Sequence, residues 1–216
     1  MKIGVITRHD NDIVDILRIN NIPIKIMDPE NFTPLELEEV EAIAILGGTD
    51  KEPLVLHPKQ RQLIENELKK GKRIFAEYCK SIGYVYLSGV KSTRYERMVY
   101  CSEENLIEGL DKGDMLEDQC NNRILPFGTA YNDNPPILQY TSANLHKKMK
   151  DTLGLKKEQE DKALWFDNPS NLLICSFRIC NFIKARFSPK KKFREVVKFI
   201  LEWLVGQRID IDLIGD

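Results

Sequence analysis

Short apolar runs near the start of the chain limit its fold more than any other feature of the sequence. Four of them lie at residues 2–7, 22–27, 42–46 and 73–78. Continuous apolar runs of this length, without polar alternation, are typical of strands in a parallel sheet that is covered on both faces. The sequence therefore predicts a buried parallel sheet built from its N-terminal part.

Helical patterns fill the stretches between these runs. Apolar residues within 13–17 have the spacing of one buried helix face. Thr33 followed by Pro34 is a helix start signal, and a further helix is expected from Pro58 until Gly71 ends it. Strands and helices that alternate through short connections predict an α/β fold with a doubly wound, mostly parallel sheet of the flavodoxin-like type, with helices on both faces.

The remainder of the chain is less regular. Residues 93–101 suggest a strand pair, so a small antiparallel excursion is expected. The acidic run at 111–118 lacks the order of a calcium loop and predicts an ordinary loop, and the very polar stretch at 146–160 predicts a surface excursion. Two strands joined by a hairpin and a long amphipathic helix then follow, at 163–166, 172–177 and 188–206.

These elements predict a single domain at residues 1–206, followed by a tail or linker at 207–216. The tail alternates apolar and polar residues. Two interpretations stay open: the tail pairs with a sheet edge, or it leads to a further domain that this sequence does not contain.

Composition and charge exclude several classes of function. The formal net charge is −1, so nothing in the whole molecule favours nucleic acid or acidic lipid. No stretch is long and apolar enough for a membrane span, and the N-terminus lacks the pattern of a signal peptide, which predicts a cytoplasmic protein. An odd number of irregularly spaced cysteines, five in all and with no CxxC pair, argues against disulfides and structural zinc. We expect no metal and no cofactor.

Three stretches carry a resemblance to a known family. They are the sequence ILGGTD at 45–50, the sequence GKRIFAEYCKSIG at 71–83, and the strand at 172–177 followed by SPKKKFREVVKFILEWL. In this order they resemble the class I glutamine amidotransferase-like superfamily. The resemblance implies that Gly47 and Gly48 contribute N–H groups to an oxyanion hole. It also implies that Cys79 is the nucleophile, on a sharp turn between a strand and a helix.

The sequence departs from the family's catalytic pattern in two places. The family elbow reads Gly-x-Cys-x-Gly, whereas Glu77 and Ser81 flank Cys79 here. The family's base is a histidine near the last strand, whereas no histidine follows His146 in this chain. A thiol without a base keeps a pKa of about 8.5 and is mostly protonated at neutral pH. Glutamine hydrolysis is therefore not expected, and the chain is closer to superfamily members without the triad, such as trehalose-utilisation proteins and auxiliary domains of carbohydrate-active enzymes.

Candidate site residues gather where predicted parallel strands end, the place where α/β sheets bind ligands. A buried Glu77 needs a partner, and Arg178 is the candidate; such a pair would serve as a ligand site or as a structural ion pair. Cys79 is either a reactive thiol or a small buried hydrophobe. The predicted ligand-binding residues are Gly47, Gly48, Thr49, Asp50, Glu77, Tyr78, Lys80 and Arg178, and Cys79 is the catalytic candidate.

The function we expect from these features is a non-catalytic amidotransferase-like domain. It would bind a small polar ligand, with carbohydrate as one candidate, or act as an assembly module in a homo-oligomer or a fused protein. The alternative is a hydrolase or amidotransferase that uses Cys79 with an unconventional base. That alternative requires a histidine or carboxylate within about 4 Å of the Cys79 sulfur.

Overall fold

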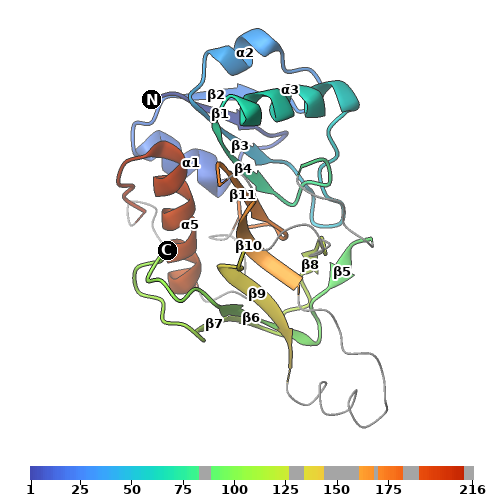
Figure 1. Ribbon diagram of the computed structural model, residues 1–216, viewed down its shortest axis with the longest axis vertical. Coiled ribbons are helices and arrows are strands. Elements are labelled where there is room, and N and C mark those ends of the chain that lie inside the picture. The colour runs from blue at the N-terminus through green and yellow to red at the C-terminus, as the bar shows by residue number, and fades with distance from the viewer. Residues whose placement is uncertain (83–88, 127–133, 144–160, 168–169, 182–189, 212–216) are drawn as a thin grey trace.

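A single mixed sheet organises the chain, and helices lie on both of its faces (Figure 1). The computed structural model describes residues 1–82, 89–126, 134–143, 161–167, 170–181 and 190–211. The nine strands of this sheet follow the order β2-β1-β3-β4-β11-β10-β9-β6-β7. Their bounds are β1 (Ile3–Ile6), β2 (Ile24–Met27), β3 (Ala42–Leu46), β4 (Arg73–Glu77), β6 (Glu96–Tyr100), β7 (Met115–Asp118), β9 (Leu138–Ser142), β10 (Asp161–Asp167) and β11 (Leu172–Cys175).

The first part of the sheet, β2-β1-β3-β4-β11, is parallel throughout, and we call it the parallel half. The strands β1, β3 and β11 are buried along their whole length, as their apolar runs predict. The predicted strand at 22–27 is shorter at its start. Ile22 donates its N–H to Leu17 in the turn that ends the preceding helix, and Pro23 has no N–H to give, so β2 begins at Ile24.

The second part, β10-β9-β6-β7, is antiparallel, and we call it the antiparallel half. It is larger than the small excursion that the sequence predicts. The prediction of a loop at 111–118 is wrong for the last residues of that range, because β7 (Met115–Asp118) pairs with β6 there. Leu116 and Glu117 are both buried in this strand, whereas the acidic sequence suggested exposed residues. The short strands β5 (Lys91–Ser92) and β8 (Arg123–Ile124) form a separate antiparallel pair.

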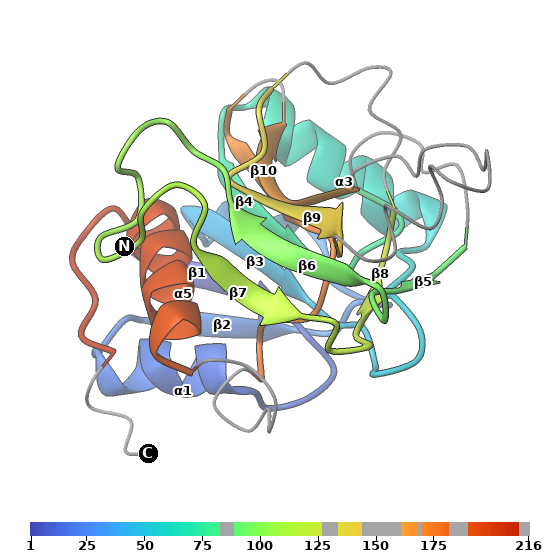
Figure 2. The same ribbon diagram turned by 90° about the horizontal axis from the view of Figure 1, so that it is seen from below.

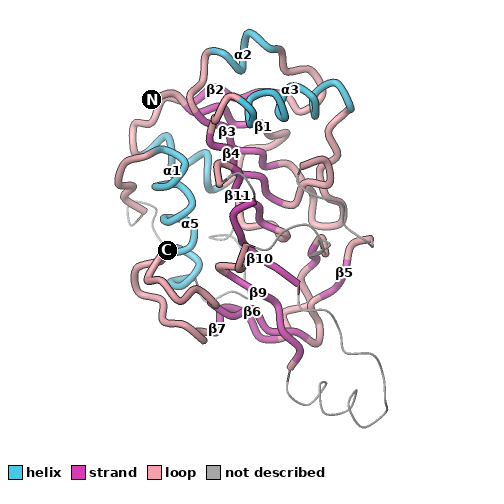
Figure 3. Tube along the Cα trace, in the orientation of Figure 1, coloured by secondary structure: helices cyan, strands magenta, loops and turns pink. Residues whose placement is uncertain are grey.

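The helices divide between the two faces of the sheet (Figures 1 and 3). One hydrophobic core joins the sheet to α1 (Asp12–Ile19) and α5 (Lys190–Val205). A second core on the other face joins it to α2 (Pro34–Glu38) and α3 (Pro58–Lys69). None of the helices among the described residues is both long enough and apolar enough to cross a membrane.

Local signals fix the ends of these helices. Thr33 and Glu36 form a capping box at the start of α2, as the Thr-Pro signal predicts. Gly71 has φ +84° just after α3, a conformation that favours glycine. At the C-terminal end, α5 stops directly before Gly206, as predicted. The predicted start of that helix, at 188–189, lies outside the described residues, as does the polar stretch 146–160.

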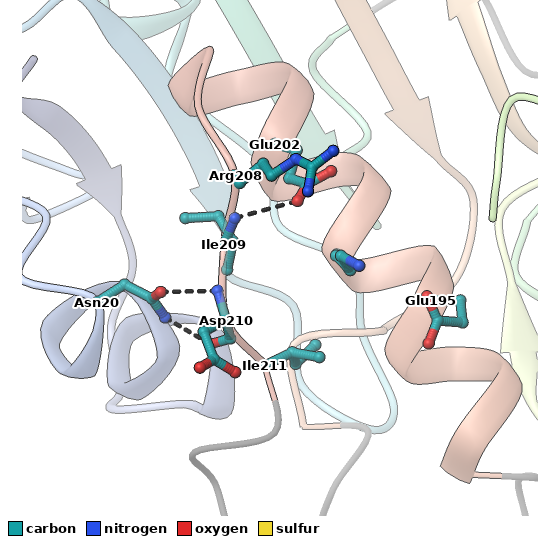
Figure 4. A pocket seen from close by; sticks show the side chains of 8 residues that line it. Asn20, Glu195, Glu202, Arg208, Ile209, Asp210 and Ile211 are labelled. Carbon is teal, nitrogen blue, oxygen red and sulfur yellow. Dashed lines mark hydrogen bonds between the residues drawn. The ribbon is translucent and has the colours of Figure 1, made fainter.

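The tail runs between α1 and α5 and is no strand over residues 207–211, so the predicted pairing with a sheet edge is wrong there. Ile209 and Ile211 are buried. Asn20 donates to the Asp210 carbonyl over 2.7 Å and accepts from its N–H over 2.8 Å, while Glu202 accepts from the N–H of Ile209 (Figure 4). The domain boundary at 206 and the role of the tail as a linker stay predictions.

Candidate functional site

Strand register brings the predicted site residues to one edge of the sheet. Glu77 at the end of β4 lies opposite Leu46 of β3 and Cys175 of β11. The segments that follow these strands therefore leave the sheet side by side. We call them together the carboxyl edge: residues 47–50, 77–80 and 176–178. Figure 2 shows how the rest of the sheet curves away from these strands towards β7.

The strained position at the end of β4 is Tyr78 rather than Cys79. Tyr78 has φ +45°, which a bulky side chain adopts only where the surroundings force it. The sequence resemblance places the family nucleophile at such a strained turn. The structure therefore puts a phenol ring at the turn and moves Cys79 one residue beyond it, which corrects the assignment of Cys79 to the elbow.

The ring of Tyr78 packs directly on the Gly-Gly loop after β3. A Cβ on Gly48 would lie 2.4 Å from Cδ1 of that ring, and a Cβ on Gly47 would lie 2.8 Å from Leu54. Both glycines are thus explained by close packing. The loop is also closed on itself, because Thr49 donates its N–H to the Glu52 carbonyl over 2.8 Å. The space over Gly48 is occupied by the ring.

Cys79 lies in the core on the α3 face. It is 2% exposed, and the isolated bridge between Leu54 and Cys79 and the packing of Ile82 surround it with aliphatic groups. Burial raises the pKa of the Cys79 thiol to about 11, although hydrogen bonds with Ser81 act in the opposite direction. A thiol with this pKa is protonated at neutral pH and is a poor nucleophile.

No base stands beside this thiol among the described residues. His9 and His57, the histidines that the structure describes, make no hydrogen bond to Cys79. His146 lies outside the described residues. The next residue, Lys80, donates its backbone N–H to the Leu54 carbonyl, which ties the segment after β4 to the chain that follows the Gly-Gly loop.

Glu77 is fully buried and holds the segment after β11. Its Oε2 accepts the N–H of Ile179 over 2.9 Å and the N–H of Cys180 over 2.6 Å. Burial raises the pKa of the Glu77 carboxyl, while the thiol of Cys180, these N–H groups and the charge of Arg178 act in the opposite direction. The other oxygen, Oε1, is buried and has no hydrogen-bond partner among the described residues.

The expected ion pair between Glu77 and Arg178 is wrong. Arg178 acts on Glu77 only through space, and its Nη1 instead pairs with the carboxylate of Asp50 across the carboxyl edge. Glu77 instead accepts the N–H groups of Ile179 and Cys180, and the Asp50 carboxylate on the loop after β3 is the ion-pair partner of Arg178. The structure thereby joins two predicted site residues that the sequence had not paired.

Several polar atoms at this edge are buried without a hydrogen-bond partner among the described residues. Besides Glu77 Oε1 they are the hydroxyls of Tyr78 and Ser176 and the Nε of Arg178. Buried polar groups are nearly always satisfied in folded proteins, so each of these atoms marks a point that a polar ligand or water would complete. Ser176 was not predicted; its position directly after a buried strand was the only signal for it.

Metal ligands do not converge here. Within the part of the chain that the structure describes, no group of three or more His, Cys, Asp or Glu side chains is placed to hold a metal ion. What the arrangement offers is hydroxyls, a carboxyl and a guanidinium at the ends of β4 and β11. It can bind a polar group but has no activated nucleophile among the described side chains.

Comparison with known proteins identifies the fold. Nothing matches among protein-family models or among curated protein sequences. The mmIFT52 N-terminal domain is 12% identical, with a TM-score of 0.56 over 98% of this chain and 100% of that chain. A ThuA-like protein from Bacteroides uniformis is 11% identical, with a TM-score of 0.56 over 96% of this chain and 93% of that chain. The likeness is one of fold.

ThuA-like proteins adopt a glutamine amidotransferase-like fold, so the resemblance seen in the sequence is supported at that level. At the turn after β4, where the resemblance placed Cys79, the residue with positive φ is Tyr78.

Proposed function

We propose that this chain is a non-catalytic, divergent amidotransferase-like domain with a doubly wound parallel half, and that it binds a small polar ligand at the carboxyl edge. The observation that carries the proposal is the group of buried, unpartnered polar atoms on Glu77, Tyr78, Ser176 and Arg178. Leaving such atoms unsatisfied costs about 1–3 kcal/mol each. A ligand that hydrogen-bonds to them recovers part of that free energy on binding.

The chemistry at the elbow argues against the alternative of a Cys79-dependent hydrolase. Tyr78 occupies the strained turn, and Cys79 is buried with a raised pKa. A hydrolase would need a thiolate beside a base and two N–H groups that face a common point. The described residues supply neither the thiolate nor the base.

Two measurements test the non-catalytic part of the proposal. Ammonia release from glutamine should be no faster with the wild-type protein than with Cys79→Ser. Iodoacetamide should leave Cys79 unlabelled at pH 8 in the folded protein, as read by mass spectrometry of the peptide, while the more exposed Cys101 and Cys120 react. Labelling of Cys79 with a midpoint below pH 8, or ammonia release that Cys79→Ser abolishes, would establish the hydrolase instead.

A third measurement tests ligand binding. Thermal shift assays with neutral monosaccharides, amino acids and small carboxylates should raise the Tm of the wild-type protein with at least one of these classes. The shift should disappear in Arg178→Gln and persist in Arg97→Gln, which breaks a separate arginine–aspartate pair with Asp118. A ligand effect that both variants keep would place binding elsewhere.

An assembly role is the second candidate, and the comparisons favour it. One structural neighbour, the mmIFT52 N-terminal domain, is part of a longer chain, and it is matched over its whole length. This is consistent with a module that acts inside a larger protein or complex. Light scattering coupled to size exclusion tests the homo-oligomer form of this role, because a monomer at every concentration would exclude it.

A further inference from the structure

The ion pair between Asp50 and Arg178 joins two side chains with very different surroundings. The side chain of Asp50 is 93% exposed, whereas that of Arg178 is 22% exposed. The pair links the loop after β3 to the segment after β11, far apart in the sequence. An ion pair with one fully hydrated partner contributes little to stability, so water or another anion can replace the Asp50 carboxylate at small cost.

Arg178 has more donor capacity than Asp50 uses. A guanidinium presents five N–H groups in a rigid plane that suits carboxylate and phosphate groups. In this structure Nη1 contacts Asp50 and the guanidinium also hydrogen-bonds to the Cys180 thiol, while the buried Nε has no hydrogen-bond partner among the described residues. This remaining donor is buried rather than exposed to solvent.

Two neighbouring hydroxyls can donate to a negative ligand. The Tyr78 hydroxyl is buried and unpartnered, as is that of Ser176. Burial raises the pKa of Tyr78, and the positive charges of Arg123 and Arg178 oppose that rise while Glu52 adds to it. Two guanidinium groups thus act on the same phenol, against one carboxylate.

We propose that the carboxyl edge is an anion site in which Arg178 is the main ligand, and that Asp50 is a built-in competitor that a carboxylate or phosphate group displaces. The incoming anion accepts from the Nε and Nη groups of Arg178 and from the Tyr78 hydroxyl. Release of Asp50 frees the loop after β3. This inference rests on the proposed ligand site and names its chemical class.

Asp50→Asn is the decisive variant, because the residue is exposed and its replacement leaves the core unchanged. Calorimetric titration with succinate and with inorganic phosphate should show binding to Asp50→Asn about five to ten times tighter than to the wild type. Arg178→Lys keeps the charge and loses the planar fork, and should weaken binding about tenfold relative to wild type. Arg97→Gln, the matched arginine control, should leave the affinity unchanged.

The outcomes separate this inference from the function on which it rests. Equal affinity in Asp50→Asn and wild type, or absence of binding by both anions to Asp50→Asn at 10 mM (roughly the weak limit of a specific site), overturns the anion site. If neutral sugars still bind the wild type and Arg178→Gln abolishes that binding, the proposed function stands while the anion inference fails. If Asp50→Asn binds just one of the two anions more tightly than the wild type does, the proposal is supported. That anion then shows whether the site accepts carboxylate or phosphate groups.

Discussion

The two halves of the sheet bury polar groups in opposite ways. In the parallel half the strands themselves are apolar, and Glu77, the one buried acid among the described residues of its strands, stands at a strand end. In the antiparallel half Glu96, Glu117 and Asp161 are buried in the strands. Glu96 and Asp161 also stand at strand ends, at the starts of β6 and β10, so the two halves differ in the partners of these acids rather than in their positions.

The antiparallel half satisfies its acids with internal partners. Lys91 on β5 bridges Glu96 and Asp161, with Nζ–O distances of 2.5 and 2.6 Å. Glu117 accepts from Asn122 over 2.6 Å and from the Tyr140 hydroxyl over 3.1 Å. The antiparallel half therefore adds polar pairs to the apolar core that it shares with α5, whereas the parallel half combines apolar packing with a polar end.

The largest expected effect is loss of core packing in the parallel half. Phe75 of β4 is fully buried in the α1–α5 core. Phe75→Ala should lower the free energy of unfolding by about 3–5 kcal/mol, measured by urea denaturation. Ile26→Ala on the edge strand β2, where the side chain is 44% exposed, is the control and should cost less than about 1 kcal/mol. Similar losses for both would contradict an apolar origin of stability in this half.

Removal of Lys91 comes next and tests the polar half. Lys91→Met leaves the buried carboxylates of Glu96 and Asp161 without their shared cation, which should cost about 3 kcal/mol at pH 7. The exposed pair of Lys2 and Glu39 is the control, and Lys2→Met should change stability by less than about 0.5 kcal/mol. A loss as small as that of Lys2→Met would show that the two buried carboxylates do not depend on this cation.

The third prediction concerns Glu117. Burial raises the pKa of this carboxyl to about 7, with the hydrogen bonds from Tyr140 and Asn122 opposing the rise. The unfolded chain ionises Glu117 near 4.5, so between pH 4.5 and 7 the folded state binds more protons and the free energy of unfolding falls as pH rises. The expected fall is on the order of 2–3 kcal/mol and levels off above about pH 7.

Glu117→Gln should remove that part of the pH dependence, because an amide does not titrate. Urea denaturation of the variant and the wild type across pH 4–8 measures the difference in slope. Equal slopes in both proteins would show that Glu117 titrates normally in the folded state.

The smallest effect is expected at the carboxyl edge. Tyr78→Phe removes a buried hydroxyl that has no partner among the described residues, so without ligand it should leave stability unchanged or raise it by up to about 1 kcal/mol. The same change should weaken succinate binding. Loss of stability without ligand would show that the hydroxyl is satisfied in the folded protein and would weaken the contrast between the two halves.

Sequence patterns predicted one half of this molecule far better than the other. The apolar runs at 42–46 and 73–78 gave strands close to β3 and β4, and the Thr33–Pro34 signal gave the start of α2. The sequence predicts a loop at β7, because its acids look solvent-exposed until Tyr140, which is distant in the sequence, lies beside Glu117. Asn122, which is close in the sequence, adds a second donor.

At the candidate site, the sequence indicated the correct segments but the wrong ion-pair partner for Arg178. Gly47 to Asp50, Glu77 to Lys80 and Arg178 do meet at one edge. The pairing of Arg178 with Asp50 and the strained turn at Tyr78 depend on strand register and on the fit of a ring over Gly48. Composition and spacing do not show which of two neighbouring residues, Tyr78 or Cys79, takes the strained position in such a turn.

The order of apolar strands and amphipathic helices by itself determined that this chain folds as an α/β sheet with helices on both faces, because burial of apolar runs is a local property of the sequence. Only the tertiary structure decided which charges meet, which buried acids find partners and which atoms at the carboxyl edge do not. Hydrogen bonds and ion pairs act over a few ångströms between residues far apart in the chain, so they exist only once the strands are in register.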